Sequence, residues 1–114
     1  TYFCTMAKSR ITIDVTTDEN HLPVAMEWTA EDGGIAQQPA SAMALSMWNA
    51  KEYAAMRMDL WTQDMSVEEM RSFVVQTMMT LADTYEKATS DKEHATAIRG
   101  FTQELAKRVG AIDE

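Results

Sequence analysis

The side chains that could carry out acid–base chemistry are sparse in this sequence. The chain holds two histidines, His21 in a polar turn and His94 in the first turn of an expected helix. A catalytic histidine works with a nucleophile and an orienting partner, and the sequence indicates neither. The chain has no G-x-S-x-G motif or P-loop, and its four glycines are too few for a phosphate-binding turn. We therefore expect both histidines to be ordinary surface residues and expect no catalytic residue.

Oxygen-bearing side chains gather near two turns, which we expect at one end of the first hairpin: Asp18, Glu19, Asn20, Glu31 and Asp32. Such turns can hold calcium, but the EF-hand spacing with its Gly and terminal Glu is missing. A solvated acidic turn is the plainer interpretation. The ten methionines mostly fall on expected core faces, where Met fills gaps. We expect no metal and no cofactor, and keep a small-ligand- or metal-responsive module near Asp18 and Asp32 as the alternative function.

Two tryptophans, Trp48 and Trp61, fall out of phase with the apolar residues around them. We expect them on the outer face of a sheet, together with Glu27, Arg57 and Asp59. Exposed Trp ringed by charge is typical of protein-interaction surfaces. The competing interpretation is that a loop over residues 31–40 covers the indoles, or that Trp61 ends the sheet against a helix.

The elements that position these residues begin with two strands. Ile11, Ile13 and Val15 alternate with polar residues, which indicates a half-buried strand. A turn over residues 18–21 and a second alternating run over 24–29 predict a hairpin. Residues 31–34 break the second strand, and we expect a loop from there to Pro39.

The next segment, residues 41–61, is ambiguous. Its first half is rich in Ala and Met, which favour a helix. Two period-two runs joined by a short polar turn nevertheless predict a second hairpin. A helix over residues 40–47 is the main alternative.

After Asp64 the apolar period changes to 3.6, which predicts helices over residues 67–88 and 91–109. Ser66 and Glu69 form a capping box, and Ser90 and Glu93 repeat its spacing. The expected stripe of the first helix is Met70, Phe73, Val74, Thr77, Met78, Leu81, Ala82 and Tyr85. The stripe of the second is Ala97, Ile98, Phe101, Leu105, Val109 and Ile112.

Strands followed by helices indicate an α+β fold. We predict a four-stranded antiparallel sheet followed by two helices packed on one face, in a single domain over residues 6–114. The face expected to meet the helices carries Ile11, Ile13, Val15, Val24, Met26, Trp28, Met43, Leu45, Met47, Met56, Met58 and Leu60.

Length and charge exclude several classes of function. The 114 residues suffice for one domain, and no apolar stretch is long enough for a membrane span. The net charge is −8, so nucleic acid and anionic lipid are unfavourable partners. Residues 1–5, which include the single cysteine Cys4, read as a vector-derived remnant or a misassigned start before Met6. With no internal disulfide, a cytoplasmic location is expected.

Several colinear motifs resemble one known family. They are Asp18-Glu19-Asn20 with Pro23, Trp28-Thr29-Ala30 with Asp32-Gly33, Leu45-Ser46-Met47-Trp48, Arg57-Met58-Asp59-Leu60-Trp61-Thr62, Asp64-Met65, Glu69-Met70 and Ala82-Asp83-Thr84. Over about Ile11 to Phe101 the sequence is similar to the gliding motility-associated protein GldC family of Bacteroidetes-type bacteria. Asn49 departs from the pattern, where an acidic residue is expected.

The resemblance implies a small cytoplasmic protein associated with gliding motility, a surface-movement apparatus linked to a secretion system. It implies no enzymatic activity, cofactor or catalytic residue. The family pattern includes both Trp48 and Trp61, and it favours the hairpin over the helix at residues 41–61. The expected function is that of a non-catalytic assembly component that binds proteins of the gliding machinery or a second copy of itself.

Overall fold

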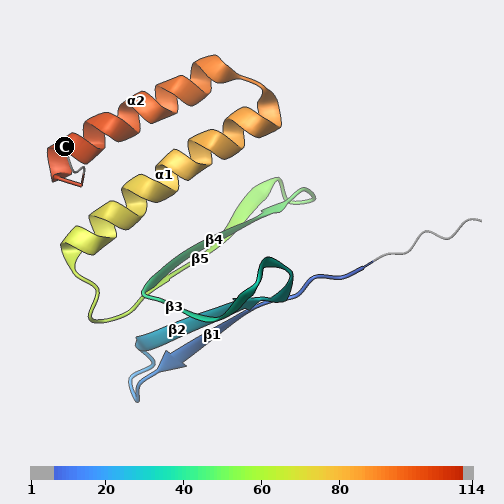
Figure 1. Cartoon of the computed structure of the whole chain (residues 1–114), viewed down its shortest axis with the longest axis vertical. Helices are drawn as coiled ribbons and strands as arrows, with labels where there is room; N and C mark the ends of the chain where they lie inside the picture. Colours follow the sequence, from blue (N-terminus) through green and yellow to red (C-terminus); the bar gives the residue numbers. More distant parts are fainter. Residues whose placement is uncertain (1–6, 112–114) are drawn as a thin grey trace, which may run out of the picture. The chain divides into compact units, whose positions relative to one another are not determined.

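The computed structural model describes residues 7–111 and divides the chain into two compact units. One unit reaches to Met65 and holds the strands, and the other begins at Ser66 and holds the helices. Figure 1 shows the strands followed by the helices in chain order. The α+β class is therefore confirmed, and each unit is described by itself.

The first three strands form one antiparallel sheet in the order β1-β2-β3. They are β1 (Ile11–Thr17), β2 (Pro23–Ala30) and β3 (Ile35–Ala40), with a short 3-10 helix, Glu31–Gly33, before β3. The loop expected from residue 31 to Pro39 is thus wrong, because most of it pairs with β2. Glu27 lies opposite Pro39 and Trp28 lies opposite Gln38. Gly34 supplies the left-handed turn into β3, with φ 71°.

The register of this sheet confirms the predicted sharing of faces in its first hairpin. Ile13 pairs with Trp28 and Val15 with Met26, so these four side chains lie on one face. Met26 is buried, Trp28 is half-buried, and Ile13 and Val15 are exposed. Met26 is thus the best-buried residue of the apolar set expected on this sheet.

The remaining strands, β4 (Ala42–Asn49) and β5 (Ala54–Trp61), pair with each other in a separate antiparallel sheet. Strand formation over residues 42–49 is confirmed, and the alternative helix is wrong. The prediction of a single four-stranded sheet is also wrong: residues 7–111 form five strands in two sheets, three and two. The bend at Ser41 separates β3 from β4 and carries the chain from one sheet to the other.

The helical unit contains α1 (Val67–Thr89) and α2 (Lys92–Val109), which pack on each other. Both helices begin and end within a residue or so of their predicted bounds. Neither helix within residues 7–111 has an apolar stretch that could cross a membrane. The predicted packing of both helices on one face of a sheet stays a prediction.

The caps of the helices confirm one capping box and correct the other. Ser66 accepts a hydrogen bond from the Glu69 N–H, and the Glu69 carboxylate accepts one from the Ser66 N–H. Ser90 does not cap α2. It ends α1 in the left-handed region at φ 60°, and Asp91 accepts from the His94 N–H instead. Two residues lie between the helices: Ser90 is the C-cap of α1, and Asp91 is the N-cap of α2.

The buried residues of the two helices are mostly small. Val75 and Ala82 are buried on α1, and Ala95, Thr102 and Ala106 are buried on α2. Small side chains let two helix backbones approach closely. Four residues of the expected stripes line a hollow shared by both helices: Met70, Val74, Leu105 and Val109. Of those stripes, Ala82 is buried, while Leu81 and Phe101 are 59% and 64% exposed. Ile112 lies outside the described residues.

We predict that Ser66→Ala lowers the free energy of unfolding by about 1 kcal/mol, the usual value of an N-cap. The physical reason is that the Glu69 N–H loses its acceptor in the first turn of α1. Chemical denaturation measures the change, and Ser66→Asp, which keeps a capping oxygen, is the control. An unchanged midpoint in Ser66→Ala would contradict the cap.

We predict that Asp91 makes stability depend on pH in the acid range. Two hydrogen bonds hold the pKa of Asp91 below its ordinary 3.8. The bond from the His94 N–H has the larger effect, and the bond from the Tyr85 hydroxyl has the next largest. A carboxylate with a lowered folded-state pKa stabilises the fold above its unfolded pKa, and that contribution is lost as pH falls through the folded pKa.

The test compares the melting temperatures of wild type and Asp91→Asn as pH is lowered. Wild type should melt higher at neutral pH, and the gap should shrink below about pH 4, near the ordinary carboxyl pKa. A gap that stays constant across this range would show that the charge of Asp91 contributes nothing.

Candidate functional site

Both faces of the β4–β5 hairpin are fixed by its register. Trp48 lies opposite Ala55, and Trp61 lies opposite Ala42. Cross-strand partners point to the same side of a sheet, and so do residues two apart. Trp48 and Trp61 therefore share one face, about 20 Å apart along the strand at about 3.4 Å per residue. The pairs between them on this face are Ser46 with Arg57 and Ala44 with Asp59.

The opposite face of the hairpin is apolar as well. It is built from three pairs: Met43 with Leu60, Leu45 with Met58, and Met47 with Met56. The sequence assigned these six residues to the face opposite Trp48 and Trp61, and the register confirms that separation. We call the side that carries Trp48, Arg57, Asp59 and Trp61 the tryptophan face.

A tyrosine joins the tryptophan face at the loop end of the hairpin. The Asn49 carboxamide oxygen accepts hydrogen bonds from the N–H groups of Lys51 and Glu52 and so shapes the turn. Tyr53 follows in the left-handed region, with φ 53°. Its ring meets Trp48 edge-on, with ring centroids 5.0 Å apart. Sequence reasoning missed Tyr53, because its place depends on the loop geometry rather than on strand alternation.

The two rings extend an aromatic surface toward solvent. Trp48 is 60% exposed, and Tyr53 is 83% exposed. Edge-to-face contact orders both rings without covering them. This end of the face is therefore aromatic, accessible and held in one geometry.

The other end of the face is tied to the three-stranded sheet. Thr62, directly after Trp61, is buried, and its N–H donates to the Ser41 carbonyl at 2.9 Å. The Gln63 N–H donates to the Pro23 carbonyl at 3.3 Å, and the Gln63 side-chain amide donates to Asp18 at 2.8 Å. These bonds fix the end of β5 beside the β1–β2 turn.

A hollow of about 250 Å³ lies at this junction. Its lining is mainly apolar and combines the β1–β2 turn with the end of β5. The lining residues are Leu22, Pro23, Asp59, Leu60, Trp61 and Gln63. Two of them, Asp59 and Trp61, belong to the predicted interaction residues, whereas Leu22, Pro23 and Gln63 were not foreseen. We call this hollow the Trp61 groove.

Charges are distributed unevenly over the predicted site. Arg57 and Asp59 are exposed on the tryptophan face, between the two indoles. Glu27 does not share that face: it lies in the other sheet, paired with Asp14 and Pro39. The prediction placed Glu27 with the tryptophans because it assumed a single sheet.

The acidic turns also differ from the expectation. Asp18 lies in the turn before β2, and Asp32 follows β2, so the length of β2 separates them. They were expected at one end of the hairpin. Asp18 uses its oxygens within the fold, accepting from the N–H groups of Asn20 and Leu22 and from Gln63. The Leu22 N–H and the Gln63 amide are the main causes that lower the pKa of Asp18.

His94 has an orienting partner that the sequence analysis did not identify. Its Nδ1 lies 2.7 Å from Asp91 Oδ2, and the Tyr85 hydroxyl donates to the same oxygen at 2.8 Å. The bond to Asp91 raises the pKa of Tyr85. Asp91 also caps α2, so this cluster joins the two helices at their connection. Within residues 7–111 no group of three His, Cys, Asp or Glu side chains is arranged to hold a metal ion.

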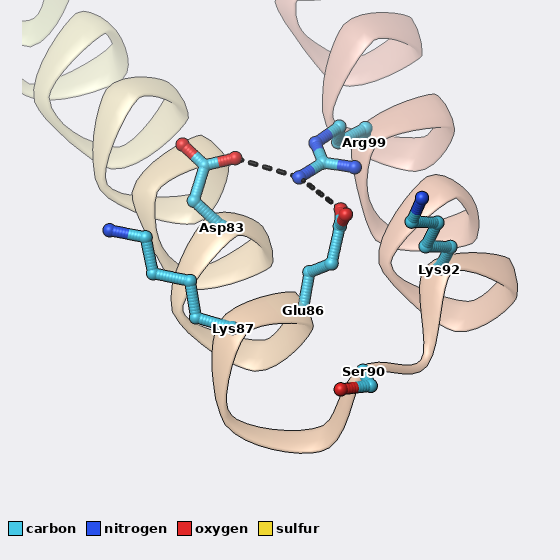
Figure 2. A pocket seen from close by; sticks show the side chains of 6 residues that line it. All are labelled: Asp83, Glu86, Lys87, Ser90, Lys92 and Arg99. Atoms are coloured by element: carbon cyan, nitrogen blue, oxygen red, sulfur yellow. Dashed lines mark hydrogen bonds and ion pairs between the residues drawn. The ribbon is translucent and has the colours of Figure 1, made fainter.

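A second hollow, of about 460 Å³, lies beside the α1–α2 connection and is lined by charged residues and Ser90. Figure 2 shows Arg99 of α2 reaching toward Asp83 and Glu86 of α1, with Lys87 and Lys92 on the rim. The Arg99 guanidinium lies 2.7 Å from Asp83 and 2.9 Å from Glu86. Both bonds raise the pKa of Arg99, and the bond to Asp83 has the larger effect. We interpret the arrangement as an ion-pair clamp between helices.

Comparison with known proteins identifies a family. Residues 23–111 match the family described as gliding motility-associated protein GldC-like. No curated protein and no solved structure matches the chain. The match covers β2 to β5 and both helices, including Trp48, Trp61 and the Trp61 groove from Pro23 onward, and β1 lies before it. The chain therefore belongs to the GldC-like family of gliding motility-associated proteins.

Proposed function

We propose that the chain is a non-catalytic, cytoplasmic assembly component of the gliding machinery that binds a protein partner through the tryptophan face. The observation that carries the proposal is the placement of Trp48 and Trp61 on one hairpin face, 60% and 55% exposed. The family description adds the context, which is an association with gliding motility. The partner is another protein of that machinery or a second copy of the chain.

The energetics of an exposed aromatic face support binding. Two indoles and one phenol ring leave a few hundred Å² of apolar surface in water, near the upper range for a monomer. Covering such a surface contributes about 25 cal/mol per Å², which amounts to several kcal/mol before the costs of association. Trp is also among the residues that most often dominate binding energy at interfaces.

Arg57 and Asp59 supply the polar part of the proposed interface. Among residues 7–111 neither side chain takes part in an ion pair within the chain. Charged pairs at an interface affect the choice and orientation of the partner more than the strength of binding. We therefore assign specificity to Arg57 and Asp59 and affinity to the aromatic rings.

A cytoplasmic, non-catalytic role has separate support. The single cysteine, Cys4, allows no disulfide within this sequence, and disulfides are typical of oxidising compartments. The histidines have structural surroundings: His94 lies in the first turn of α2 beside Asp91, and His21 lies in the β1–β2 turn. The alternative of a ligand-responsive acidic turn receives no support, since β2 separates Asp18 from Asp32.

We predict that Trp48→Ala combined with Trp61→Ala weakens partner binding at least tenfold, or about 1.4 kcal/mol. Light scattering measures self-association. A quantitative pull-down from the native organism measures recovery of the partner.

The matched control is Trp48→Phe with Trp61→Phe, which keeps two aromatic side chains and should retain most of the binding. Circular dichroism checks that both variants fold. If the folded alanine variant matches wild type in both readouts, the tryptophan face is not the interface. If the alanine variant unfolds while the phenylalanine variant does not, the tryptophans serve the core.

A further inference from the structure

We infer that the Trp61 groove receives a single apolar side chain from a basic segment of the partner protein, with a flanking Lys or Arg pairing with Asp59. The inference rests on the proposed function and deepens it by naming the chemistry of the partner. It adds residues outside the tryptophan face, chiefly Leu22, to the binding surface.

The size of the groove decides what kind of group it can hold. Its volume of about 250 Å³ lies below the range of about 300–1,000 Å³ that is typical of small-molecule and cofactor sites. Leu22, Pro23, Leu60 and Trp61 form an apolar lining. The space and the chemistry suit one aliphatic or aromatic side chain better than a nucleotide or a polar metabolite.

The groove is preformed by hydrogen bonds that do not involve an occupant. The Gln63 N–H is bound to the Pro23 carbonyl, and its side-chain amide is bound to Asp18. Thr62 is anchored to Ser41 and, through its hydroxyl, to Asp64 at 2.7 Å. The bonds of Gln63 hold the β1–β2 turn against the end of β5, and those of Thr62 fix the residue between Trp61 and Gln63. The free-energy cost of ordering the groove on binding is therefore small, which favours binding.

The charge at the groove selects a basic partner. Asp59 is the charged side chain of the lining, and within residues 7–111 it makes no ion pair. Asp18 accepts a hydrogen bond from the Gln63 side chain, so a second carboxylate, ionised at neutral pH like any exposed Asp, lies next to the lining. The whole sequence carries a net charge of −8. A second copy would bring the same acidic groove edge and the same net charge, so we assign the groove to a different, basic protein.

The test begins with a displayed library of random peptides selected on the full chain. We expect the enriched peptides to share a Leu, Met or Phe next to Lys or Arg. The most enriched peptide, made synthetically, then becomes the probe for binding measurements. Enrichment of acidic or uncharged peptides, or no enrichment, would overturn the inference.

Two variants locate the bound peptide. Leu22→Lys adds a positive charge and removes apolar lining in an exposed turn, and it should weaken binding of the peptide at least tenfold. Asp59→Asn should weaken binding and reduce its dependence on salt, because the screened ion pair is lost. Leu81→Lys, at an exposed apolar residue of α1 that belongs to neither the tryptophan face nor the groove, is the matched control and should leave peptide affinity unchanged.

The variants also separate this inference from the proposed function. If the tryptophan double variant loses the partner while Leu22→Lys and Asp59→Asn retain it, the tryptophan face stands and the groove inference fails. If wild type is a dimer and Leu22→Lys makes it monomeric, the occupant is a second copy, and the basic partner is wrong. Should Leu22→Lys fail to fold, unchanged peptide binding by Asp59→Asn still overturns the ion pair.

Discussion

The strict alternation of side chains in the two-stranded β4–β5 sheet is the constraint from which the functional interpretation follows. Every residue of these strands points to one of two faces, and both faces carry large apolar groups. One face has four methionines and two leucines, and the other has two tryptophans. A two-stranded hairpin is marginally stable in water unless a face is packed. Packing another element or protein against either face would therefore stabilise the hairpin. The tryptophan face, which also carries Arg57 and Asp59, has the composition of a protein-interaction surface.

The features that depend on local sequence could be predicted. The ends of α1 follow from Ser66 and Glu69, because a capping box needs only neighbouring residues. The hairpin register follows from alternation, so the sequence places Trp48 and Trp61 on the same face. The cap of α2 was misassigned by one residue, since Ser90 also satisfies the spacing. The choice of Asp91 depends on how α1 ends, and this lies outside the local pattern.

The features that depend on distant partners could not be predicted. Strand β3 includes Gln37, Gln38 and Pro39, which have little strand tendency of their own. It is a strand because β2 offers it hydrogen-bonding partners. The division into two sheets could not be predicted either, because it follows from a bend at Ser41 that no residue type indicates. The Trp61 groove needs Leu22 beside Leu60 and Trp61, and the hydrogen bonds of Gln63 bring them together from separate hairpins.

The pairing of the elements has a consequence for how the chain folds. The main element pairings within residues 7–111 join consecutive elements: β1 with β2, β2 with β3, β4 with β5, and α1 with α2. Closing the short connections between such neighbours costs little chain entropy. Proteins dominated by contacts close in sequence fold quickly, on a scale of microseconds to milliseconds for the most local ones. Both members of each pair have been synthesised once the second element leaves the ribosome. The pairs of strands and the pair of helices can therefore form one after another during synthesis.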